Sequence, residues 1–81
     1  MTMAGLRSVD EVVSVDREVM SGAPVFRGTR VPIQTLLDHL ESGVSLEIFL
    51  DDFPTVPREQ AVRFLELAGE AVVATLQADS A

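Results

Sequence analysis

The chain has 81 residues, a mass of 8.8 kDa, and six basic against 13 acidic residues, which gives a formal net charge of −7. So short a chain forms one small domain with a limited core, and a hydrophobic content of 47% excludes a disordered tail. The absence of cysteine and the presence of one histidine exclude disulfide scaffolds, thiolate sites and multi-histidine metal sites. No apolar run approaches the roughly 18 residues that span a membrane, and the first residues lack the apolar core of a signal peptide. We therefore expect a cytoplasmic protein without a cofactor or metal.

The first part of the chain predicts a tail followed by a small β element. Residues 1–10 mix polar and apolar types without a period, so we expect a flexible N-terminal tail, a single domain over 11–76, and a second flexible tail over 77–81. The β-branched run EVVSV at residues 11–15 predicts a short strand. A turn signal at 20–24 separates it from a second strand, Val25–Phe26.

Helix one follows the β element. Pro32 suits the first helical position, because its missing N–H would have no helical acceptor there. Four apolar residues then occupy one face at helical spacing: Ile33, Leu36, Leu37 and Leu40. Gly43 is suited to end this helix, since glycine adopts the left-handed conformation at little cost.

Helices two and three complete the predicted fold. Ser45 is the predicted N-cap of helix two, Leu46–Asp52, and Pro54 ends it. Pro57 begins helix three. Its apolar stripe consists of Ala61, Phe64, Leu65, Ala68, Val72 and Leu76. The expected fold class is mainly α: a three-helix, helix-turn-helix-like domain with a short N-terminal β element.

Helix three has more apolar residues than one buried face of a helix can contain. Val62, Leu67, Val73 and Ala74 lie off its main face. A domain of this size cannot bury all of them, so we expect a homodimer or a hetero-oligomer. The alternative is that these are scattered surface residues, which are common in monomers.

The sequence does not favour an enzyme. It contains no Gly-rich phosphate loop, GxSxG or HExxH motif. His39 lies beside the apolar stripe of helix one and is interpreted as a boundary residue rather than a catalytic one. Asp51 and Asp52 are consecutive and diverge by about 100° on a helix, so they are interpreted as structural or solvated. Their carboxylates lie at the negative end of the helix dipole, and an arginine is the expected neutralising partner.

Helices two and three, joined by a turn over residues 53–56, have the layout of a helix-turn-helix. The start of helix three would then enter the DNA major groove with Arg58, Gln60 and Arg63, whose side chains suit guanine and adenine edges. The acidic residues on the same helix count against this interpretation, because they would meet phosphates.

The most distinctive local feature is an arginine pair in an acid-free stretch, Arg27 and Arg30. Two interpretations remain open for it. The arginines contact phosphate or the acidic groups of a protein partner. Alternatively, they form a structural clamp to Asp16, Asp51 or Asp52.

Two sequence motifs support a resemblance to one particular family. Residues 22–32 read G-x-P-x-x-R-G-T-R-x-P, and D-D-F-P follows at 51–54, after Gly43 and S-L-E at 45–47. Over about residues 13–68 the chain resembles the domain-of-unknown-function family 433 and is similar to the VapB-like antitoxins in that group. Pro57 stands where that family often has Ser or Thr.

The resemblance implies a helix-turn-helix-like fold and a type II toxin–antitoxin role beside a PIN-like ribonuclease toxin. The antitoxin would bind and block that toxin, and would also bind its own promoter DNA as a dimer or complex. The acidic surface would cover the toxin's basic RNA-binding surface, while Arg27 or Arg30 competes at its carboxylates. Two other functions stay open: a stand-alone dimeric DNA-binding transcriptional regulator, and a non-catalytic assembly module.

These hypotheses predict specific contact residues. The expected DNA contacts are Arg27, Arg30, Arg58, Gln60 and Arg63. The expected contacts to a protein partner are Arg27, Arg30, Val62, Leu67, Val73 and Leu76.

Overall fold

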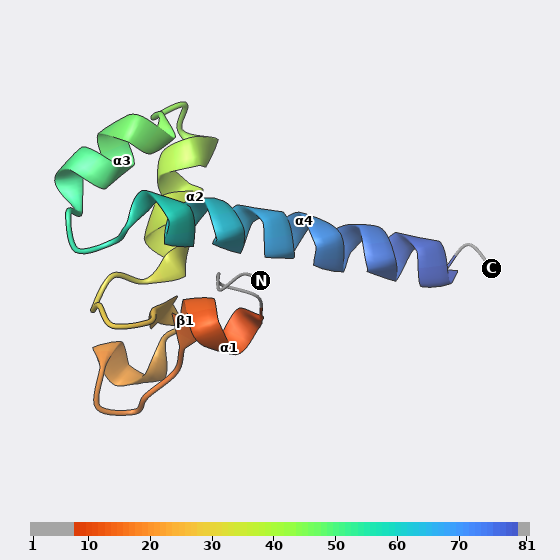
Figure 1. Ribbon diagram of the computed structural model, residues 1–81, viewed down its shortest axis with the longest axis horizontal. Helices are drawn as coiled ribbons and strands as arrows, with labels where there is room; N and C mark the ends of the chain where they lie inside the picture. The colour runs from red at the N-terminus through yellow and green to blue at the C-terminus, as the bar shows by residue number, and fades with distance from the viewer. Residues whose placement is uncertain (1–7, 80–81) are drawn as a thin grey trace, which may run out of the picture.

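The computed structural model describes residues 8–79 and shows a mainly helical domain with a two-stranded sheet near the N-terminus (Figure 1). This confirms the predicted fold class. The elements follow in the order α1 (Val9–Val12), β1 (Val13–Ser14), a 3-10 turn (Met20–Gly22), β2 (Val25–Phe26), α2 (Ile33–Glu41), α3 (Leu46–Asp52) and α4 (Arg58–Asp79).

The N-terminal element differs from the predicted strand at 11–15. The chain first forms one helical turn, α1, and only then β1. The Ser8 N–H donates to Glu11 Oε1 at 3.1 Å, which satisfies a backbone donor at the start of the turn. The ordered fold therefore includes residues 8–10, which the sequence assigned to a tail; the rest of that predicted tail lies outside the described residues.

The sheet is antiparallel and minimal. Val13 pairs with Phe26 and Ser14 with Val25. The connection between the strands contains three successive residues with positive φ, Met20–Gly22. Only the third is glycine, so the segment holds two side chains in a conformation that L-residues rarely adopt.

The residues predicted to begin and end α2 and α3 lie at the ends of these helices. Pro32 is the N-cap of α2 rather than its first helical residue. Gly43 follows the end of α2 with φ +83°, the left-handed conformation expected of it. Ser45 Oγ accepts a hydrogen bond from the Ile48 N–H at 3.2 Å, which confirms the predicted cap of α3.

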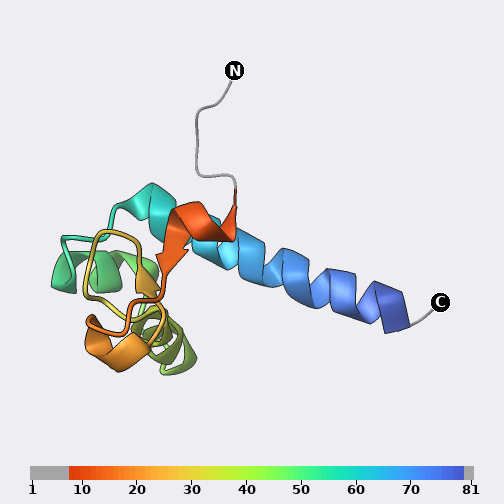
Figure 2. The ribbon, with the colours of Figure 1, turned by 90° about the horizontal axis from the view of Figure 1, so that it is seen from below.

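Helix α4 is longer than predicted. It begins after Pro57 and continues to residue 79, so 77–79 are helical rather than part of a flexible tail. Residues 80–81 lie outside the described part of the chain. Its first half packs against the other elements, whereas its second half extends past them into solvent (Figures 1 and 2). None of the described helices is long and apolar enough to cross a membrane.

The core lies between the sheet, α2, α3 and the first half of α4. Phe26 is fully buried at its centre and contacts Phe49 of α3 and Phe64 of α4, with ring centroids 6.2 and 5.7 Å apart. Burial of an aromatic side chain is the largest single apolar contribution such a small domain has. The other buried residues of this cluster are Val12, Val31, Leu36, Val56 and Ala61. Val25 of β2 is buried as well.

Candidate functional site

The arginine loop, residues 27–30, is a tight connection between β2 and α2. The Phe26 N–H donates to the Val31 carbonyl at 3.0 Å, which closes the loop. The Thr29 hydroxyl donates to the Phe26 carbonyl at 2.8 Å and accepts from the Val31 N–H at 3.0 Å. Gly28 has φ +85°, which allows the sharp reversal. The loop therefore presents both of its arginines on the surface of a rigid backbone.

The two arginines have different environments. Arg27 is tied to the fold: its N–H donates to the Val12 carbonyl at 2.8 Å and its Nε to the Asp10 carbonyl at 2.5 Å. Arg30 is exposed, and its side chain makes no hydrogen bond or ion pair with another residue between 8 and 79. Arg27 thus has a structural role, whereas Arg30 is open to a ligand.

The predicted clamp to carboxylates is not formed. Within residues 8–79, no ion pair joins either loop arginine to Asp16, Asp51 or Asp52. Asp52 lies beside His39 of α2 instead of an arginine, with Nε2 and Oδ2 3.9 Å apart.

His39 has a structural environment. Its Nδ1 lies 2.8 Å from the Thr35 carbonyl, which can only accept, so the proton is on Nδ1. The ring also lies edge-on to Phe49 and Phe53, with centroids 5.5 and 5.8 Å apart. Among the described residues no group of three His, Cys, Asp or Glu side chains could hold a metal ion.

The two sequence motifs that carry the family resemblance lie side by side in the structure. The arginine loop and Phe53 line one shallow hollow, together with Thr55 from the turn after α3 and Met20 from the strained 3-10 turn. Segments that are more than 20 residues apart in the sequence therefore form a single surface around Arg30. Its walls are apolar apart from that guanidinium and the threonine hydroxyls.

The residues expected to contact DNA at the start of α4 are engaged within the chain. Arg58 forms an ion pair with Glu47 of α3. Arg63 NH1 lies 3.2 Å from Glu66 and 3.4 Å from Glu70. Each arginine thus brings a carboxylate with it, and a phosphate backbone approaching this face would meet both charges.

Gln60 is not a surface residue, contrary to the sequence-based expectation. Only 6% of it is exposed. Its Nε2 donates to the Val12 carbonyl at 2.8 Å and to the Arg27 carbonyl at 3.1 Å. A side chain buried against the sheet cannot reach a base edge, so Gln60 is a structural link rather than a DNA contact.

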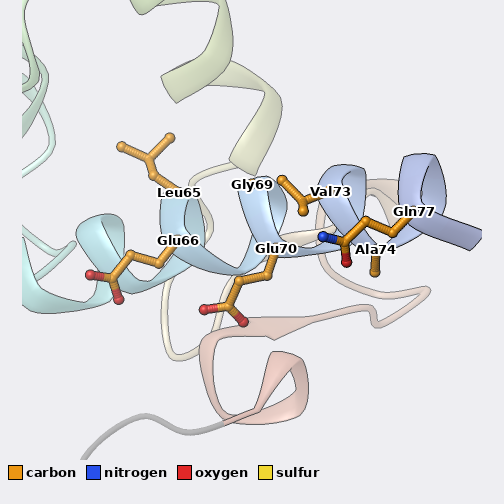
Figure 3. Close-up of a pocket in the computed structure, with 7 residues that line it drawn as sticks. All are labelled: Leu65, Glu66, Gly69, Glu70, Val73, Ala74 and Gln77. Carbon is orange, nitrogen blue, oxygen red and sulfur yellow. The ribbon is translucent and has the colours of Figure 1, made fainter.

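The expected protein-contact residues of α4 do not share one surface. Val62 and Val73 line what we call the α4 groove, two shallow hollows that meet at Glu66. Its residues are Glu59, Val62, Arg63, Leu65, Glu66, Gly69, Glu70, Val73, Ala74 and Gln77. In its distal part Leu65 and Val73 lie on one side of the helix and Glu66 and Glu70 on the other (Figure 3).

Leu67 belongs to a second, entirely apolar hollow, between α4 and the N-terminal segment. The residues that line it are Val9, Val13, Val15, Pro24, Ile33, Phe64, Leu67, Ala68 and Ala71. Leu76 is 62% exposed at the far end of α4, next to Val72 and Val73, which are 60% and 52% exposed. The second half of α4 therefore presents large apolar side chains that no described element covers.

Sequence reasoning missed two features of this region. One is the position of the acidic residues of α4 along an edge of the groove, to which the sequence analysis assigns no binding role. The other is Gly69, where a Cβ would meet no atom within 4 Å, so the glycine leaves an open notch in the groove. The seven-residue spacing of Glu59 and Glu66 was the available signal.

Comparison with known proteins places the chain in a family. Residues 13–68 match the family model described as "Protein of unknown function (DUF433)". The chain is also similar to "Uncharacterized protein y4eO" of Sinorhizobium fredii (strain NBRC 101917 / NGR234), with 32% identity over 66 residues. That match covers 82% of this chain but only 29% of the relative, which is a much longer protein. No solved structure matches the chain. The protein therefore belongs to the DUF433 family.

Proposed function

We propose that this protein is an antitoxin that binds and neutralises a PIN-like ribonuclease toxin. The observation that carries the proposal is the uncovered second half of α4, where Val72, Val73 and Leu76 are each more than half exposed. Full burial of such a side chain stabilises a complex by about 1.5–3 kcal/mol before ordering costs are subtracted. A stable complex with a protein partner is therefore the natural state of this surface.

The charge distribution supports a nuclease as the partner. A PIN-like ribonuclease would have a basic RNA-binding surface and clustered carboxylates that hold metal ions. The stretch 38–53 contains five acids and no Lys or Arg, and it covers the C-terminal part of α2 and all of α3. This acidic surface would occupy the basic surface of the toxin, while Arg30, which is exposed, would pair with its carboxylates.

Binding to promoter DNA is proposed only for the complex. The helix-turn-helix layout of α3 and α4 is present, but Arg58 and Arg63 pair with acids of this chain and Gln60 is buried. These contacts disfavour the stand-alone transcriptional regulator. The non-catalytic assembly module shares the apolar surface with the antitoxin, and it differs in predicting no inhibition of a nuclease.

Co-expression with the product of the neighbouring gene tests the proposal. The two proteins should copurify, growth should be restored relative to the neighbour expressed alone, and addition of this chain should stop RNA cleavage by the purified neighbour. A neighbour that does not bind, or that cleaves RNA equally well in the complex, would exclude the antitoxin. Promoter binding by this chain alone, lost in Arg58→Ala with Arg63→Ala, would favour the regulator instead.

A further inference from the structure

Helix α4 carries an apolar pattern that shares Leu65, Val72 and Leu76 with the predicted stripe. Residues 62, 65, 69, 72 and 76 are Val, Leu, Gly, Val and Leu, spaced three, four, three and four apart. This is the spacing with which one helix packs along another in a coiled coil. At 1.5 Å per residue the seam is about 21 Å long.

The seam is accessible along most of its length. Val62 and Leu65 are half-buried against the domain, whereas Gly69, Val72 and Leu76 are exposed. Gly69 leaves a notch that is open to solvent. In coiled-coil packing a side chain of the facing helix inserts into such a hole.

The two edges of the seam have different charge. On one edge the positions seven residues apart are Glu59, Glu66 and Val73, and Glu70 lies one turn after Glu66, further from the seam. The three glutamates line the α4 groove. The equivalent positions on the other edge are Ala61, Ala68 and Thr75, which are uncharged. One guanidinium, that of Arg63, serves both Glu66 and Glu70. The acidic edge therefore keeps negative charge after its internal ion pair is counted.

We propose that the α4 groove, together with Val72 and Leu76 of the seam beside it, receives a basic amphipathic helix of the partner protein. The partner helix would place apolar side chains along the seam and would set Arg or Lys residues, seven apart, against Glu59 and Glu66. Edge charges of this kind select the partner helix and fix its register. This inference rests on the proposed function, because it identifies the part of the nuclease that α4 would bind.

A second copy of this chain fits the groove less well. In an antiparallel pair the acidic edge of one helix would face the acidic edge of the other, which places like charges together. In a parallel pair the acidic edge would face the uncharged edge and gain no ion pair. Both arginines of α4 are already paired within the chain, and each copy carries a charge of −7.

Three synthetic helical peptides provide the probe. Each has 21 residues; the first has leucines at three–four spacing and arginines on its edges, the second has Glu for every Arg, and the third keeps the arginines but has Gln for every Leu. Titration of the intact chain, followed by fluorescence anisotropy of labelled peptide, should show the first peptide binding at least tenfold more tightly than the other two. Equal binding of the Arg and Glu peptides would overturn the proposal.

Two matched pairs of variants locate the site. Gly69→Arg fills the notch with a basic helix former and should weaken binding of the Arg peptide at least tenfold. Gln34→Arg adds the same charge on the exposed face of α2, outside the groove and the seam, and should change binding less than threefold. Glu59→Arg with Glu66→Arg should reverse the preference toward the Glu peptide. Glu18→Arg with Glu41→Arg makes the same change of net charge elsewhere and should leave the preference intact.

The same variants separate this inference from the antitoxin proposal. If the peptides do not discriminate but the neighbouring product is still neutralised, the groove is wrong and the antitoxin stands. If the peptides bind as expected but no neighbouring nuclease is inhibited, the groove stands and the antitoxin falls. A dimer of the chain alone that dissociates in Gly69→Arg would assign the groove to a second copy and overturn the proposal.

Discussion

The side-chain amide of Gln60 donates a hydrogen bond of 2.8 Å to the carbonyl oxygen of Val12, 48 residues earlier in the chain. The same nitrogen donates to the carbonyl of Arg27 at 3.1 Å. One buried glutamine thus joins α4 to the end of α1 and to the first residue of the arginine loop. Buried polar groups that are hydrogen-bonded in this way fix the relative position of the elements they connect.

Loss of this link should destabilise the domain. Gln60→Leu keeps most of the buried volume but leaves the Arg27 carbonyl without the amide, so we expect a loss of about 1–3 kcal/mol in the free energy of unfolding. Urea denaturation followed by circular dichroism measures it. Gln34, whose Nε2 bonds only to the exposed Asp38, provides the matched control; Gln34→Leu should stay within about 0.5 kcal/mol. Equal effects of the two would argue against the structural role of Gln60.

Substitution of Arg30 should affect partner binding, whereas substitution of Arg27 should affect stability. Arg30→Ala should leave the unfolding free energy within about 0.5 kcal/mol of the original, because its side chain has no partner between residues 8 and 79. It should nevertheless weaken binding to the neighbouring product and raise residual RNA cleavage in the complex. Arg27→Ala removes the bond to the Asp10 carbonyl, so it should lower stability by about 0.5–1.5 kcal/mol. If Arg27→Ala weakens binding and Arg30→Ala lowers stability instead, Arg27 is the contact residue.

A glycine-to-alanine change should have opposite signs at two positions. Gly43 has φ +83°, where a Cβ is strained, so Gly43→Ala should destabilise by about 1 kcal/mol. Gly69 lies within α4 and has open space around it, so Gly69→Ala should stabilise by about 0.5–1 kcal/mol. Thermal denaturation of both variants, in the same buffer, checks the pair. A loss of stability in Gly69→Ala would mean that the helix is not regular there.

The cap of α3 gives a further check on the fold. Ser45→Ala removes the acceptor of the Ile48 N–H and should cost about 1 kcal/mol. Ser45→Asp retains an acceptor and adds negative charge at the helix N-terminus, so it should be close to neutral or slightly stabilising. Denaturant midpoints of the two variants are the measurement. If alanine and aspartate give the same loss, the hydroxyl does not act as a cap.

Much of the local structure was predictable from particular residues. Ser45, Pro54 and Gly43 mark helix ends because each acts on its own backbone, through a cap, a missing donor or a left-handed conformation. The bounds of α3 and the turn before α4 follow from these local effects alone. The apolar stripes at helical spacing likewise identify the core faces of α2 and α4.

The sites depended on contacts between distant segments. Nothing in the neighbourhood of Gln60 indicates that its amide is buried under the sheet rather than exposed at a helix start. The sequence identified Arg27 and Arg30 as a pair, but only the tertiary structure gives Arg27 a backbone carbonyl as its partner and leaves Arg30 exposed. An ion pair or a buried hydrogen bond requires two groups within a few ångströms, and chain folding alone decides which groups those are.

The sequence by itself determined α2 and α3 with their ends, the start of α4, the family and the surplus of apolar side chains on the last helix, because each is set by local backbone preference or by a residue pattern. The tertiary structure decided which surplus side chains remain uncovered. The other elements end near the middle of α4, so the same apolar pattern is core in its first half and open surface in its second (Figure 1). It also decided that Glu59 and Glu66 edge that open surface, and therefore which kind of partner helix it fits.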